Sequence, residues 1–141
     1  MITISVFSDF SEFPGLRHCA ISENSGEEFY HNILNKGFKD AFESKTKLIV
    51  NLDDTAGYAS SFLDEAFGNL VFDFTLNQVK NIVQIISEQE PYWKEMIETK
   101  TYPEWESRRK KGERPKITIE HSPWYRLQNN KITLETWEHL E

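Results

Sequence analysis

The order of apolar and polar positions along the chain predicts strands that alternate with helices. Apolar residues occupy every second position from residue 2 to residue 6, which is the two-residue period of a strand. The nearly continuous apolar run at 47–53 is typical of a central strand covered on both faces, and residues 81–86 supply another. Residues 17–22, after the turn-like segment 13–15, form a further expected strand that could pair with the first as a hairpin. We therefore expect a small mixed sheet.

Three stretches carry apolar residues at helical spacing. The first begins with the capping-box pair Ser25 and Glu28, and the second begins at Ser61. The third begins near Ser87 and has Pro91 in its first turn. Short crossovers of this kind place parallel strands side by side with right-handed connections. The expected fold class is therefore α/β, with helices packed against the small sheet.

The second helix, expected at 61–74, has one broad apolar face and a mixed face opposite. Ser61 stands just ahead of the first apolar residue, so we expect it to be the N-cap. On the mixed face, a solvent-facing Gly68 would cost about 1 kcal/mol relative to Ala, and an exposed Phe72 needs an explanation. Either a partner protein approaches this face closely, or the sheet or the C-terminal segment covers it. In the first case Gly68→Ala should leave folding intact.

The pattern weakens after the third helix. A further helical piece stops at Gly112, and residues 116–120 and 131–136 then alternate as the strands of a terminal hairpin would. The charge balance changes in the same region, from 8 Lys+Arg against 16 Asp+Glu in residues 1–100 to 8 against 7 in residues 101–141. We expect an α/β domain at 1–100 and a C-terminal extension at 101–141 that docks on it.

Composition narrows the class of protein. A chain of 141 residues with 38% hydrophobic residues is long and apolar enough to bury a core without disulfides. Its start has no secretion-signal pattern, its single Cys19 cannot form an internal disulfide, and no apolar run is long enough to span a bilayer. We expect a cytoplasmic protein without membrane attachment. The formal net charge of -7 argues against a general affinity for nucleic acid.

The histidines and the cysteine show no motif of a metal site. His18, His31, His121 and His139 lack the spacing of zinc ligands, and Cys19 is expected to be a buried small residue. We therefore expect no metal and no cofactor.

Carboxylates at the end of the second strand suggest an enzyme as one alternative. Residues 51–55 resemble the D-x-D-x-T loop of aspartate phosphatases, but Asn51 stands where the attacking carboxylate would be. An enzyme of this kind would use Asp53, Asp54 and Asp64 around the same loop.

A basic run suggests nucleic-acid binding as a second alternative. Residues 108–116 are rich in Lys and Arg and lie close to Trp105, so they could contact phosphates while the indole stacks on a base. The same charges also favour a helix C-terminus and docking on the acidic domain, which we prefer.

The segment GYASSFLDEAFGNL, at 57–70, resembles a STAS-like family of unknown function found in bacteria. SGEEFYHNIL, LIVNLDD, EPYW and EWESRR support the match. More distant relatives, the STAS domains, include anti-sigma factor antagonists, which are non-catalytic modules that bind an ATPase-type kinase similar to histidine kinases. The resemblance therefore implies a protein-interaction module without catalysis of its own.

In those relatives a Ser at the start of the second helix is phosphorylated, and the phosphate blocks partner binding. The resemblance places Ser61, or alternatively Ser60, at this switch position, although Ala59 and Phe62 stand where the relatives carry Asp and Gly. Helix capping alone would also explain a Ser here. The partner-binding residues expected on the same helix are Asp64, Glu65, Gly68 and Phe72.

Overall fold

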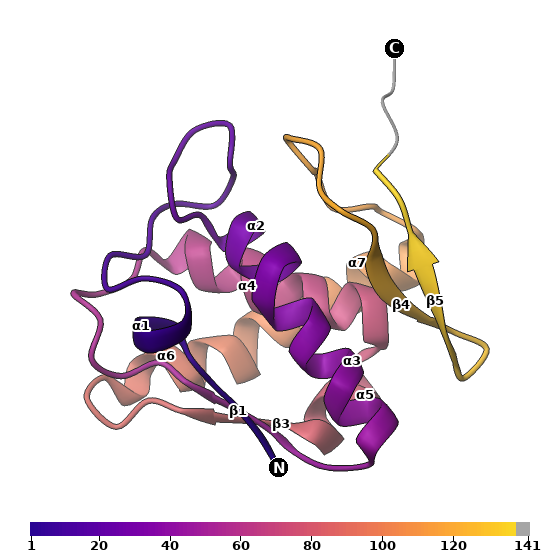
Figure 1. Ribbon diagram of the computed structural model, residues 1–141, viewed down its shortest axis with the longest axis horizontal. Helices are drawn as coiled ribbons and strands as arrows, with labels where there is room; N and C mark the ends of the chain where they lie inside the picture. Colours follow the sequence, from indigo (N-terminus) through magenta and orange to yellow (C-terminus); the bar gives the residue numbers. More distant parts are fainter. Residues whose placement is uncertain (138–141) are drawn as a thin grey trace.

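Three short parallel strands form the sheet of this α/β fold. The strands are β1 (Ile2–Ser5), β2 (Leu48–Asn51) and β3 (Val83–Ile86). In the computed structural model, which describes residues 1–137, they lie in the order β1-β2-β3, so β2 is central as expected (Figure 1). The register places Val50 opposite both Ile4 and Ile85, and all three side chains are buried. The sheet is parallel throughout rather than mixed.

Helices make up most of the rest of the chain. They are α1 (Val6–Asp9), α2 (Gly26–Phe29), α3 (Asn35–Ser44), α4 (Ser60–Phe74), α5 (Leu76–Ile82), α6 (Pro91–Met96) and α7 (Tyr102–Lys111). The π-helical segments η1 (Tyr30–Leu34) and η2 (Ile97–Thr101) join α2 to α3 and α6 to α7. Residues 26–44 and 91–111 are therefore two continuous helices. No helix in the described part of the chain is long and apolar enough to cross a membrane.

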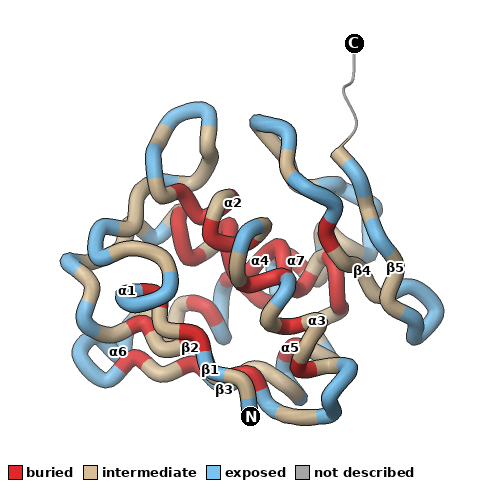
Figure 2. The backbone as a smooth tube through the Cα atoms, in the orientation of Figure 1, coloured by how far each residue is buried: buried red, intermediate tan, exposed pale blue. Residues whose placement is uncertain are grey.

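The helix α4 is the centre of the core. Eleven of its fifteen residues are buried, and buried positions concentrate on it and on the helix that starts with α2 (Figure 2). Phe62 stacks on Phe29 at 5.7 Å between ring centroids, and Phe74 stacks on Phe38 at 4.3 Å. Helix α3 contacts β1 and β2, and its Phe38 packs on Phe74 of α4. The continuous helices 26–44 and 91–111, together with α5 and β4, thus contact α4.

The mixed face of α4 is covered by the C-terminal part of the chain. Gly68 is buried, and a Cβ built there would lie 2.1 Å from Cε2 of Trp105 in α7. Glu65 is also buried, and the Phe72 ring lies 5.3 Å below the guanidinium of Arg126. The exposure expected for Gly68 is therefore wrong, because the missing side chain makes room for an indole of the same molecule. Of the two alternatives, coverage by the C-terminal segment is confirmed.

The predicted second strand is also wrong. Residues 17–22 lie in a loop whose backbone serves a helix instead of a sheet: the carbonyls of Leu16 and Arg17 accept the N–H groups of Gly26 and Glu27. These N–H groups lie in the first turn of α2, where backbone N–H groups have no acceptor within the helix. The loop therefore caps α2, and no hairpin forms with β1.

Two of the three expected helix starts need correction. Ser25 caps α2 as predicted, since its hydroxyl accepts the N–H of Glu28 at 3.1 Å. Ser61 is not an N-cap, because α4 begins at Ser60 with Ala59 in the cap position. The third helix begins at Pro91, and the Ser87 hydroxyl donates to the Glu90 carbonyl instead of accepting from the helix.

The predicted C-terminal hairpin is present, but its first strand lies at Trp124–Gln128 instead of at 116–120. The strands β4 (Trp124–Gln128) and β5 (Lys131–Glu135) pair antiparallel. Asn129 and Asn130 form the two-residue turn with φ values of 53° and 63°, a conformation that Asn tolerates. Residues 116–120, predicted as a strand, lie outside the sheet. The helix before them stops at Gly112 as expected, with a φ of 74°.

The predicted division at residue 100 falls inside the continuous helix 91–111. Residues on both sides of it belong to one buried cluster, since Ile97 and Trp105 are both in the core. The division into a domain and an extension stays a prediction.

We predict that Gly68→Ala lowers the free energy of unfolding by about 1–3 kcal/mol, because the added methyl group overpacks the Trp105 indole. The indole cannot move away easily: its Nε1 donates to Asp64 at 3.2 Å, and Arg108 lies 4.1 Å from its ring centroid. Urea unfolding measures the loss. The loss should be smaller when Gly68→Ala is made in a Trp105→Leu background. An equal loss in both backgrounds would show that contact with the indole does not cause the destabilisation by Gly68→Ala.

Candidate functional site

A hollow lies at the amino end of α4, where the sequence places its candidate serines. It has a volume of about 240 Å³, and Ser60, Arg17 and Lys100 contribute to its lining. Ser60 is exposed as the first residue of α4, whereas Ser61 is half-buried. The free N–H groups and the dipole of a helix N-terminus favour an anion at this end. Of the two candidate serines, Ser60 is the accessible one.

Arg17 links the hollow to the acidic residues of α4. Its Nη1 lies 2.8 Å from Oδ2 of Asp64 and 3.1 Å from Oε1 of Glu65. His18 Nε2 lies 3.6 Å from the same Glu65 oxygen. Burial raises the pKa of Glu65, although Asn69 and Arg17 oppose this by hydrogen bonding to the carboxylate. Asp64 and Glu65 are thus engaged within the molecule, and only Asp64 lines the hollow.

The carboxylates proposed for an enzyme are separated by different structural roles. Asp53 accepts the backbone N–H groups of Glu88 and Gln89 at 3.2 and 3.0 Å. The Asp54 N–H donates to Oε1 of Gln89 at 2.8 Å, and Nε2 of Gln89 donates to the Asp54 carboxylate at 2.9 Å. These contacts tie the loop after β2 to the loop after β3. Asp64 instead pairs with Arg17, so each of the three carboxylates has its own donors.

Part of the basic run is also engaged inside the molecule. Arg108 stacks over Trp105, and Arg109 forms a two-point pair with Glu106, with distances of 2.6 and 3.1 Å. Both contacts are within α7, so they hold these two basic side chains on their own helix. Docking of the run on the acidic domain stays a prediction.

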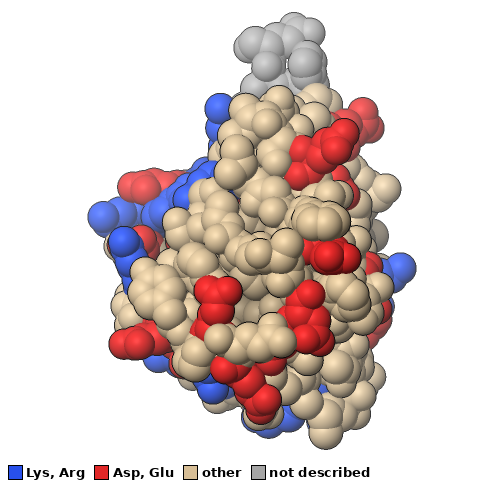
Figure 3. All heavy atoms as spheres, turned by 90° about the vertical axis from the view of Figure 1, so that its left-hand side faces the viewer, with Lys and Arg blue, Asp and Glu red and all other residues tan. Residues whose placement is uncertain are grey.

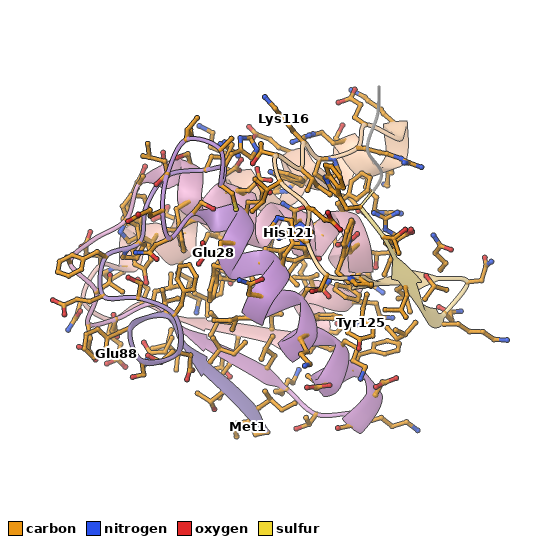
Figure 4. The ribbon with its side chains drawn as sticks, turned by 45° about the horizontal axis from the view of Figure 1, so that its top comes forward. Met1, Glu28, Glu88, Lys116, His121 and Tyr125 are labelled. Atoms are coloured by element: carbon orange, nitrogen blue, oxygen red, sulfur yellow. The ribbon has the colours of Figure 1, made fainter. Side chains whose placement is uncertain are left out.

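A second candidate site, which sequence reasoning missed, surrounds the buried carboxylate of Glu27. Glu27 is 1% exposed, and its Oε1 accepts from the Cys19 N–H at 3.1 Å and from the Thr118 hydroxyl at 2.6 Å. Its Oε2 accepts from the Thr118 N–H at 3.1 Å and lies 2.7 Å from His121 Nε2. We call Cys19, Glu27 and His121 the Glu27 cluster. His121 comes from the loop before β4, which lies against the helix that carries Glu28 (Figure 4).

The surroundings of the Glu27 cluster are tightly packed. The His31 ring stacks on the His121 ring at 4.1 Å with an angle of 7° between planes. His31 Nδ1 is buried and has no hydrogen-bond partner in the described structure, and burial lowers the pKa of His31 to about 3. Cys19 Sγ lies 3.2 Å from the Ser25 hydroxyl, and burial raises the pKa of the thiol to about 11. The thiol is therefore neutral at pH 7 when no cation is bound.

No sequence signal could have revealed this cluster. Cys19 and Glu27 are eight positions apart, but His121 follows 94 positions after Glu27, and no spacing rule connects them. The prediction that no metal is bound rested on such spacing, which only detects ligands that are close along the chain. His139, one of the histidines considered, lies outside the described residues.

We predict that Glu27 makes the free energy of unfolding depend on pH in the acidic range. Burial alone would raise its pKa, but the hydrogen bonds from His121 and Thr118 outweigh this and lower the pKa from 4.5 to about 2. The ionised carboxylate therefore stabilises the folded state above about pH 4.5, and this contribution is lost as the pH falls from 4.5 to 2. Glu27→Gln should cost about 1–3 kcal/mol at pH 7 and flatten the loss below pH 4.5. Urea unfolding across this pH range tests it, and equal slopes for both proteins would contradict it.

Comparison with known proteins agrees with the fold. Residues 25–93, from the cap of α2 to the start of α6, match the model of a family described as a STAS-like domain of unknown function. No curated protein and no solved structure matches the chain significantly. The matched segment contains α4 and the strands β2 and β3 of the parallel sheet. Residues 25–93, which are 69 of the 141 residues, therefore match the family of STAS-like domains of unknown function.

Proposed function

We propose that this STAS-like domain is a non-catalytic module that binds a protein partner at the carboxyl ends of its three parallel strands. The chain leaves this edge of the sheet through α1, through the loop before α4 and through the loop before α6. In open α/β sheets, this edge is where binding sites gather, because the connecting loops are free to vary there.

Exposed apolar side chains in the segment that follows β1 are the observation that carries the proposal. Four of the eight large apolar side chains that are exposed in the described residues come from positions 7–21: Phe7, Phe13, Leu16 and Ile21. Phe13 and Ile21 are 64% and 68% exposed. Exposed apolar side chains concentrated in one segment mark interaction surfaces more often than isolated ones do. We call these four residues the loop patch.

The charges around the loop patch favour a basic partner. Exposed carboxylates follow each of the three strands, at Asp9 and Glu12, at Asp54, and at Glu88 and Glu90. Figure 3 shows the side of the molecule that carries the segment of the loop patch. Carboxylates are spread among uncharged residues on this side, and Lys and Arg lie mainly at the margins of the view. Complementary charges would steer a partner with apolar and basic residues to this face.

A phosphate on Ser60 would change this surface. Ser60 is exposed at the start of α4, in the hollow that Arg17 and Lys100 line. A phosphate adds about -1.5 to -2 charges, which the helix N-terminus accepts. It would also pair with Arg17 and Lys100, the two cations of the hollow, so that a partner could no longer use them. By its resemblance to the regulatory STAS domains, the chain would have an ATPase-type kinase as partner. We favour Ser60 over Ser61 as the phosphosite, since Ser61 is half-buried.

The site residues expected on α4 have two different roles in this proposal. Asp64 lines the hollow beside Ser60 and can affect a bound partner. Gly68 and Phe72 instead pack against α7 and β4, and the buried Glu65 pairs with Arg17. The separate structural roles of Asp53, Asp54 and Asp64 favour the module over the enzyme alternative.

We predict that Phe13→Asp and Ile21→Asp each weaken partner binding at least tenfold, because a charge replaces an apolar contact. The partner is first recovered from native extract with the tagged chain, then purified and titrated by calorimetry. Leu134→Asp is the matched control, since Leu134 is 61% exposed but lies on β5. All three variants should unfold within about 0.5 kcal/mol of the unmodified chain. If the control weakens binding as much as the patch variants, the partner does not use the loop patch.

We also predict that Ser60→Asp weakens binding to the same partner without lowering stability, because Asp is favourable in the first turn of a helix by about 0.3–1 kcal/mol. Ser61→Ala is the matched control and should bind normally. Peptide mass spectrometry of the chain from its native source should locate phosphate on Ser60. Normal binding by Ser60→Asp would reject the switch and leave the loop patch unaffected.

A further inference from the structure

We propose that the Glu27 cluster binds a divalent metal ion of the zinc class, with Cys19 Sγ, a Glu27 carboxylate oxygen and His121 Nε2 as ligands. These three ligand atoms all lie within 4.8 Å of one another. Among the described residues, they form the only group of three or more Cys, His, Asp or Glu side chains that meets this distance. The site would join the loop before α2, the helix α2 and the loop before β4.

The ligand types select the metal. A thiolate, an imidazole and a carboxylate are the three side-chain ligands of zinc, whereas Mg²⁺ and Ca²⁺ prefer oxygen ligands alone. Three protein ligands leave one tetrahedral position for water. Cys19 is half-buried, so an ion can reach the site from the solvent side.

The burial of Glu27 is an independent reason to expect a cation. A buried carboxylate is normally paired with a positive side chain or bound to a metal. No Lys or Arg within residues 1–137 forms an ion pair with Glu27, and its partner His121 is charged only when protonated. The two side chains are 1% and 5% exposed, so water does not screen the charge. A metal ion would supply the missing positive charge.

Binding requires a small rearrangement that the local structure permits. Glu27 Oε2 and His121 Nε2 are 2.7 Å apart, whereas two ligands of one tetrahedral zinc ion lie about 3.3 Å apart. His121 belongs to a loop between α7 and β4, so its ring can slide along the stacked His31 ring. As the metal binds, the Cys19 thiol loses its proton to solvent. The Nε2 proton that His121 donates to Glu27 is also released to solvent, so the ligating ring is neutral with its proton on Nδ1.

Cobalt titration of the metal-free chain tests the proposal. After removal of metal with a chelator, one equivalent of Co²⁺ should produce a thiolate-to-cobalt charge-transfer band. The band can be assigned without ambiguity, because the chain contains one cysteine. Cys19→Ser should abolish the band, and Glu27→Gln and His121→Ala should weaken Co²⁺ binding at least tenfold. His18→Gln is the matched control next to Cys19 and should bind Co²⁺ normally.

Zinc binding should also stabilise the fold, because the three ligands come from segments that separate on unfolding. At a hundredfold excess of Zn²⁺ over its Kd, the Tm of the full chain should rise by roughly 10 °C, and this rise should be absent in Cys19→Ser. No charge-transfer band with the unmodified chain, or the same Co²⁺ affinity for Cys19→Ser, would overturn the proposal. The Glu27 cluster would then be an ion pair of Glu27 and His121 only.

Discussion

The close packing of Trp105 on Gly68 is the contact on which the rest of the structure depends. A surface helix in an α/β fold normally keeps one face in water, but α4 is buried on both faces because an indole from α7 fills the space of the missing side chain. The contact brings Asp64 under the indole N–H and beside Arg17. The amino end of α4 is consequently fixed in position, with Ser60 exposed at its first turn.

The covering of α4 also explains the buried charges. Glu27 and Asp73 are 1% and 2% exposed, and a carboxylate in the interior needs donors. Thr118 and His121 supply them for Glu27, and Arg126 supplies one for Asp73 at 2.8 Å. Burial still raises the pKa of Asp73 to about 6. These three donors follow residue 111 and add to the Cys19 N–H for Glu27 and the Tyr30 hydroxyl for Asp73, so residues after the family match complete the set of donors.

Two regions with different chemistry result from this architecture. The edge formed by the carboxyl ends of the strands is exposed, acidic and apolar, and its loops are joined by Asp53 and Asp54. Such a surface fits recognition of another protein. The Glu27 cluster is enclosed and made of metal-ligating side chains. Its proposed task is to hold together three segments that are far apart in the sequence, which a small chain with one cysteine cannot do with a disulfide.

The sequence by itself determined the elements whose signals are local. Periodicity located the helix that Ser25 caps, the central strand and α4, because neighbouring residues alone decide these features. Tertiary structure decided what required contacts between distant residues. Residues 17–22 became a loop because the N–H groups of α2 needed acceptors, and Gly68 became buried because an indole 37 positions later packs on it. The Glu27 cluster belongs to the same class, since only folding brings His121 to a carboxylate 94 positions before it.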